Sequence, residues 1–87
     1  MISTRTSVGV TAAKIVSKAV NEHRTIIVRP DGNDIYIGGD DVTTTNGLKI
    51  DNNTNFTIEI PPNEELWAVT SSGTHAAIVL TWPVIEQ

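Results

Sequence analysis

Apolar residues occupy every second position in several short segments of this chain. The clearest segment is F-T-I-E-I at residues 56–60, where three apolar side chains fall on one face and a threonine and a glutamate on the other. A period of two is typical of a strand with one buried face. Pro61 and Pro62 follow, and because proline cannot donate a hydrogen bond to a sheet, we expect this strand to end at Ile60.

Two other segments are apolar on both faces. They are T-I-I-V-R at residues 25–29, which stays apolar until Arg29, and the run from residue 76 to residue 82. A strand with two apolar faces is typical of the middle of a sheet. We therefore expect the second segment to be a central strand or to lie at a subunit contact, with one face made by Ala76, Ile78, Leu80 and Trp82.

The stretch D-I-Y-I-G-G-D-D-V-T-T-T-N-G-L-K-I at residues 34–50 is the one around which we expect the domain to be organised. Its first part alternates as a strand does and is interrupted at Gly38-Gly39, where glycine enters positive φ at little cost. Asn46-Gly47 predicts a type I′ hairpin turn, with a new strand from Leu48. The polar segment Asp40 to Thr45 is then an exposed loop that faces a partner.

The other segments complete a set of seven or eight short strands. Residues 2–11 suit an edge strand or an arm, and residues 12–20 fit both helical and strand spacing, with a short strand and a turn through residues 21–23 favoured. Strands punctuated at intervals of about 8–12 residues predict an all-β protein, either a small antiparallel β-sandwich or a jelly-roll-like barrel. We divide the chain into an N-terminal arm (1–7), a single domain (8–83) and a C-terminal tail (84–87).

The composition agrees with a small β domain that needs external support. The chain contains 11 Ile, 9 Val and 12 Thr, and these β-branched side chains favour a pleated sheet. A domain of 87 residues buries only about 60–65% of the surface that its unfolded chain exposes. Because there is no cysteine to form a disulfide, we expect the support to come from oligomerisation.

The charge distribution limits the partners. A formal net charge of −4 argues against nucleic acid or an anionic membrane surface. Residues 1–29 hold five Lys or Arg and one Glu, a charge of +4, whereas residues 30–87 hold one Lys and nine carboxylates, a charge of −8. Such a split favours an oriented contact with a charged neighbour. The sequence has neither the roughly 20 apolar residues of a membrane span nor the apolar segment of a secretory signal, so we expect a cytoplasmic protein or part of a particle assembled there.

No group of residues points to catalysis. His23 and His75 are the only histidines, and a metal site would need a closer set of ligands. Asp40, Asp41 and Asp51 carry oxygen ligands of the kind Ca²⁺ prefers, but their spacing matches no calcium loop. The glycine pattern of a serine nucleophile elbow is missing too. We expect no catalytic residue, metal or cofactor, and a protein that is not an enzyme.

Large aromatic side chains are the best candidates for a binding role. Trp67 and Trp82 suit the core or a subunit contact, and each also suits stacking on a sugar ring. Tyr36 faces away from Ile35 and Ile37 on its strand and suits a contact as well. Together with the basic N-terminal segment, which we expect to face the partner, these residues give the predicted interface: Arg5, Lys14, Lys18, Tyr36, Trp67 and Trp82.

The chain resembles a group of small all-β proteins encoded among the structural genes of tailed bacteriophages and prophages. The resemblance runs from about Val8 to Leu80 through T-A-A-K-I-V, H-R-T-I-I-V-R, the stretch at 34–50, F-T-I-E-I, E-E-L-W-A-V-T-S-S-G-T-H-A and A-I-V-L. Its most specific part is I-Y-I-G-G-D-D-V-T-T-T-N-G. The chain departs from the usual pattern at D-N-N-T-N, residues 51–55, which replaces a Pro-Gly turn, and in its last four residues.

The resemblance implies a virion protein. The expected role is that of a head decoration, or cement, protein that forms a homotrimer and binds the major capsid protein on the outer surface of the shell. The expected location is therefore the capsid surface, after assembly in the host cytoplasm. The alternative is a module of a head or tail fibre that binds a host receptor or glycan.

Overall fold

The protein is a sandwich of two four-stranded antiparallel sheets. The computed structural model describes residues 2–18 and 23–83, and this part of the chain contains no helix and so none able to cross a membrane. Its strands are β1 (Ile2–Val8), β2 (Ala13–Val16), β3 (Arg24–Asp31), β4 (Ile35–Gly38), β5 (Leu48–Ile50), β6 (Phe56–Ile60), β7 (Leu66–Val69) and β8 (His75–Pro83). The predicted all-β class is confirmed.

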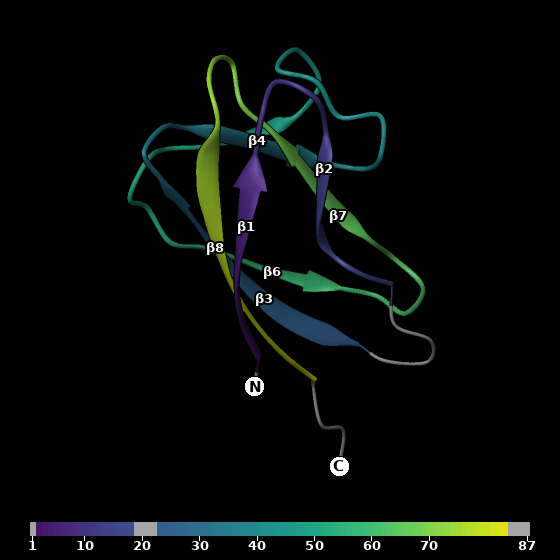
Figure 1. Ribbon diagram of the computed structural model, residues 1–87. Coiled ribbons are helices and arrows are strands. Elements are labelled where there is room, and N and C mark those ends of the chain that lie inside the picture. Colours follow the sequence, from purple (N-terminus) through teal and green to yellow (C-terminus); the bar gives the residue numbers. More distant parts are fainter. Residues whose placement is uncertain (1, 19–22, 84–87) are drawn as a thin grey trace.

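The strand order is that of a jelly roll. The first sheet, which we call the β1 sheet, has the order β1-β8-β3-β6, and the second, the β2 sheet, has the order β2-β7-β4-β5. Figure 1 shows β1 beside β8 and β2 beside β7. The first strand thus pairs with the last, the second with the seventh, the third with the sixth, and the fourth with the fifth. This is one long hairpin folded over itself, as in a jelly roll, and residues 39–47 between β4 and β5 are its turn.

The connections gather at two ends of the sandwich. Because successive strands run in opposite directions, the connections after β1, β3, β5 and β7 lie at one end and those after β2, β4 and β6 at the other. We call the first the Asp34 end, since Asp34 immediately precedes β4, and the second the Trp67 end, since Trp67 lies near the start of β7.

The core fills the space between the two sheets. Ile26 and Val28 of β3, with Val79 of β8, are almost fully buried and face Ile35 and Ile37 of β4. The predicted inner face of residues 56–60 is confirmed, because Ile60 is buried and Phe56 and Ile58 pack against the core. Branched aliphatic side chains from both sheets therefore give the fold its stability.

The strand pairing shows which of the predicted segments lie at the edge of a sheet and which lie in its centre. The segment at 75–83 is confirmed as central, since β8 lies between β1 and β3. Residues 2–7, which the sequence alone sets apart as an arm, pair with β8 along their length and make β1 an edge strand. Residues 13–16 form a strand, β2. The predicted turn at residues 21 and 22 and the tail at 84–87 lie outside the described residues.

The glycines of the β4–β5 connection have a different role from the predicted one. Neither Gly38-Gly39 nor Asn46-Gly47 has positive φ, so the predicted type I′ turn is wrong. Instead, a Cβ on Gly47 would lie 2.7 Å from the Cβ of Tyr36 and 2.8 Å from Cγ2 of Val42. Val42 is buried over this spot, and Gly38 also adjoins its side chain. The glycines make room for a loop that packs back on its own hairpin.

Candidate binding surfaces

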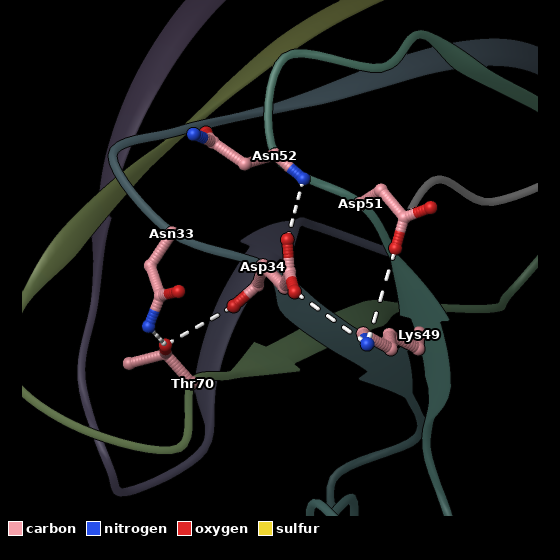
Figure 2. Close-up of polar contacts among 6 residues, drawn as sticks. All are labelled: Asn33, Asp34, Lys49, Asp51, Asn52 and Thr70. Atoms are coloured by element: carbon pink, nitrogen blue, oxygen red, sulfur yellow. Dashed lines mark hydrogen bonds and ion pairs between the residues drawn. The ribbon is translucent and has the colours of Figure 1, made fainter.

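Polar contacts close the Asp34 end (Figure 2). Oδ1 of Asp34 accepts a hydrogen bond from the backbone N–H of Asn52 at 2.6 Å, and Oδ2 lies 3.5 Å from Nζ of Lys49. The hydroxyl of Thr70 donates to the backbone oxygen of Asp34 at 3.1 Å and accepts a hydrogen bond from the amide of Asn33 at 3.3 Å. Three connections of the chain meet at this one aspartate.

The fourth connection joins the same network. The backbone N–H of Thr70 donates to the carbonyl of Gly9 at 2.9 Å, which ties the β7–β8 connection to the β1–β2 connection. Thr70 is only 1% exposed. Since buried polar groups need partners, these bonds serve to hold the loops together, and we assign the network a structural role.

The acidic and histidine residues considered as ligands do not come together. Asp51 lies at the Asp34 end, 4.0 Å from Nζ of Lys49, whereas Asp40 and Asp41 follow β4 at the Trp67 end. His75 begins β8, with Nε2 3.1 Å from the carbonyl of Ser72, and His23 precedes β3 at the opposite end. Residues 2–18 and 23–83 contain no group of three His, Cys, Asp or Glu that could hold a metal ion.

The outer surface of the β1 sheet carries an apolar band, which we call the β8 face. It consists of the apolar side chains that point away from the β2 sheet on the two central strands: Ile27, Ala76, Ile78, Leu80 and Trp82. Leu80 lies opposite Ile27, while their neighbours Val79 and Ile26 point into the core. All five are half-buried. None of them belongs to the core cluster between the sheets, so the core itself does not require them to be apolar.

Polar and charged residues surround the β8 face. On β1, Arg5 lies opposite Ile78, and its Nη2 is 2.7 Å from Oδ2 of Asp31 on β3, so this ion pair spans the band across β8 beside Ala76 and Ile78. On the other side, Arg29 of β3 also lies opposite Ile78, and Glu59 of β6 lies opposite Thr25. An apolar centre with a charged rim is the usual anatomy of a protein–protein interface.

A hollow of about 260 Å³ opens at the Trp67 end. All three connections of this end contribute to it, and its lining is Lys18, Gly39, Asp40, Asn63, Glu64, Glu65 and Trp67. The buried guanidinium of Arg24 holds two of these connections in place, because it donates to the carbonyls of Ser17 at 2.8 Å and Glu64 at 3.1 Å. The hollow is therefore supported from inside the fold.

The indole of Trp67 is fixed by its neighbours. Its Nε1–H donates to Oε1 of Glu65 at 3.2 Å, and Oε2 of Glu65 lies 3.3 Å from Nζ of Lys14. The ammonium of Lys14 is also 5.9 Å from the centre of the indole ring, within the range of a cation–π contact. The hydrogen bond from Trp67 and, after it, that from Lys14 lower the pKa of Glu65.

The six residues of the predicted interface lie in three places. Arg5 and Trp82 lie on the outer surface of the β1 sheet, whereas Lys14, Lys18 and Trp67 gather at the Trp67 end. Tyr36 lies on the outer surface of the β2 sheet, opposite Val69 and Lys49. Since Arg5 and Lys14 belong to opposite sheets, the basic segment does not form one continuous surface.

Some residues of these surfaces were not expected from the sequence. Ile27 joins the β8 face because β3 pairs with β8, and Asp40, Asn63 and Glu64 join the hollow because connections distant in sequence meet there. The two-sided apolar patterns of residues 25–29 and 76–82 were the signals in the sequence that pointed to the β8 face.

Comparisons with protein-family models, with curated proteins and with solved structures give no significant match for this chain.

Proposed function

We propose that this protein is a structural component of a tailed-bacteriophage virion, a capsid decoration protein that works by binding rather than by catalysis. The observation that carries the proposal is the β8 face, an apolar band on the outside of a sandwich whose core is formed by other residues. The viral context comes from the resemblance of residues 35–47, I-Y-I-G-G-D-D-V-T-T-T-N-G, to small phage structural proteins.

The β8 face is the contact between copies of the chain in this proposal. Covering Ile78, Leu80 and Trp82 removes apolar surface from water at about 25 cal/mol per Å². The rim has charges of both signs, Arg29 on one side of Ile27 and Glu59 on the other, so it is able to pair with the rim of a second copy. In the homotrimer that we propose, this contact is heterologous: one part of the β8 face and its rim meets a different part of the face of the next copy, and three such contacts close a ring.

The trimer then binds the major capsid protein through several contacts at once. Each contact alone is weak, but three linked copies raise the effective concentration of the second and third contacts. A small domain without disulfides thereby gains stability from its assembly as well. On a shell with many equivalent positions, such binding joins neighbouring subunits and reinforces them.

Leu80→Lys tests the β8 face, because it places a charge in the centre of the apolar band. We expect this variant to stay folded, to be a monomer by light scattering after size exclusion, and to lose at least about tenfold in affinity for purified heads that lack the protein. Leu48→Lys is the matched control, since Leu48 is 53% exposed on the edge strand β5, outside the β8 face. It should remain a trimer and bind heads as the unmodified chain does.

The proposal also predicts the behaviour of the heads. Heads that carry the unmodified protein should resist heating better than heads without it. A monomeric unmodified chain, a Leu80→Lys variant that still assembles, or heads to which the protein does not bind would each contradict the proposal.

A further inference from the structure

The two ends of the sandwich differ in how their polar side chains are used. At the Asp34 end, the side chains of Asn33, Asp34 and Thr70 are bonded to one another or to nearby loops. At the Trp67 end, Lys18, Asp40, Asn63 and Glu64 line the hollow, and no hydrogen bond or ion pair joins their side chains to another described residue. Apart from the pair of Trp67 and Glu65, the donors and acceptors around the hollow therefore do not bind each other.

We infer that this hollow is a binding subsite for one neutral hexopyranose ring of a glycan. The inference goes beyond the proposed function and does not depend on it. A pyranose has an apolar C–H face and a rim of hydroxyl groups that donate and accept hydrogen bonds. Trp67 offers an aromatic surface to the C–H face of the sugar. Asp40, Asn63 and Lys18 offer hydrogen-bond acceptors and donors to its hydroxyl groups.

The volume of the hollow agrees with a single sugar ring. At about 260 Å³ it lies below the roughly 300–1,000 Å³ of pockets that hold drug-sized ligands. Lys14 does not line the hollow, although its ammonium lies over the indole.

The charges of the lining select the class of sugar. Asp40, Glu64 and Glu65 line the hollow, and because Glu65 is paired with Lys14, two carboxylates without an ion-pair partner among the described residues remain against the one ammonium of Lys18. Carboxylates accept hydrogen bonds strongly from hydroxyl groups, but they repel a ligand that carries a carboxylate or sulfate of its own. The subsite thus favours a neutral hexose over a uronic or sialic acid.

The site is also built before any ligand binds. Glu65 fixes the indole through the bond from Nε1, and the buried Val42 holds the loop that carries Asp40 against Gly47. Arg24 holds the carbonyl of Glu64 at 3.1 Å. The indole and the loop backbone therefore need little reorganisation, whereas the exposed side chains of Lys18, Asp40 and Asn63 lose rotamer freedom when a ligand orders them.

Ligand-observed NMR on the full chain tests the inference, with the methyl glycosides of glucose, galactose and mannose as neutral probes and methyl glucuronide as the charged one. We expect at least one neutral probe to bind more tightly than the glucuronide. Trp67→Ala should weaken that binding by at least about tenfold. The matched control is Leu48→Ala, which removes an exposed apolar side chain of the edge strand β5, outside both the hollow and the β8 face, and should leave the affinity unchanged.

Asp40→Ala is the second variant, and it applies even if Trp67→Ala does not fold. Asp40 is an exposed loop residue, so its removal should leave the melting temperature unchanged and weaken the neutral sugar by about fivefold. Failure of all three neutral probes to bind, tighter binding of the glucuronide, or undiminished binding by Asp40→Ala would overturn the inference. None of these results bears on whether the chain binds heads.

Discussion

Glu65 links two side chains whose positions shape the Trp67 end. One of its oxygens accepts from the indole of Trp67 and the other pairs with Lys14, and both contacts favour the ionised carboxylate. The pKa of Glu65 is therefore lower in the folded chain than in the unfolded one. The stabilisation is complete above the unfolded pKa and is lost as the pH falls through the lowered folded pKa.

The lowered pKa of Glu65 predicts how the fluorescence of Trp67 responds to acid. In a Trp82→Phe background, where Trp67 is the remaining tryptophan, we expect its fluorescence to change in a step as Glu65 takes up a proton. The midpoint should lie below the ordinary pKa of a glutamate, because the hydrogen bond from Trp67 and the pairing with Lys14 lower the pKa of Glu65. The measurement is a fluorescence titration while far-ultraviolet circular dichroism reports that the fold is intact.

Glu65→Gln should abolish this fluorescence step, because an amide has no proton to gain in this range. Glu59→Gln, on the exposed face of β6, should leave it in place. A step that persists without Glu65 would mean that another group near Trp67 titrates.

Among the elements, the β4–β5 connection is unusual in packing against its own hairpin. Gly47→Ala would bring a methyl group within 2.7 Å of the Cβ of Tyr36 and 2.9 Å of the carbonyl of Thr43. Backbone and Cβ atoms have little room to move, so we expect a loss of about 1–3 kcal/mol in the free energy of unfolding. For a domain of this size each kcal/mol lowers the melting temperature by about 4–8 °C.

Gly39→Ala is the control for this prediction, since both glycines lie in the same connection. A Cβ on Gly39 would meet only Oδ1 of Asp41, at 3.4 Å, and Gly39 does not have positive φ. The substitution should be neutral or slightly stabilising, because it restricts the unfolded chain. If chemical denaturation gave equal losses for the two variants, close packing at Gly47 would not be the cause.

The sequence predicts where the strands lie better than it predicts how the loops fold and which residues meet in them. The alternation at residues 56–60 and the two apolar faces at 76–82 are local patterns, and both correspond to strands in the structure. Gly47 was misjudged because its role depends on Tyr36 and Val42, which approach it only after the hairpin forms. The hollow was missed for the same reason, since Lys18, Asp40 and Asn63 meet only through the jelly-roll order of the strands.

On the scale of the whole molecule, the two proposed surfaces occupy different parts of the sandwich. The β8 face covers the outer surface of the β1 sheet, and the hollow lies at the Trp67 end, where it is lined by Trp67 of β7 in the β2 sheet and by three connections. Leu80 belongs to the β8 face alone, and Asp40 lines the hollow alone. Assembly through the β8 face would leave the hollow open for a sugar.

This separation predicts independent effects of two substitutions. Leu80→Lys should abolish the trimer and binding to heads but keep the affinity of the isolated chain for the neutral hexoside, whereas Asp40→Ala should weaken the hexoside and leave the trimer and head binding unchanged. Light scattering, co-sedimentation with heads and ligand-observed NMR on both variants measure all three properties. Sites that do not share residues contribute independently, so the double variant should show the sum of the two defects. If Leu80→Lys alone removed sugar binding from a folded chain, the hollow would depend on the oligomer, and the site would have to include a surface from a second copy.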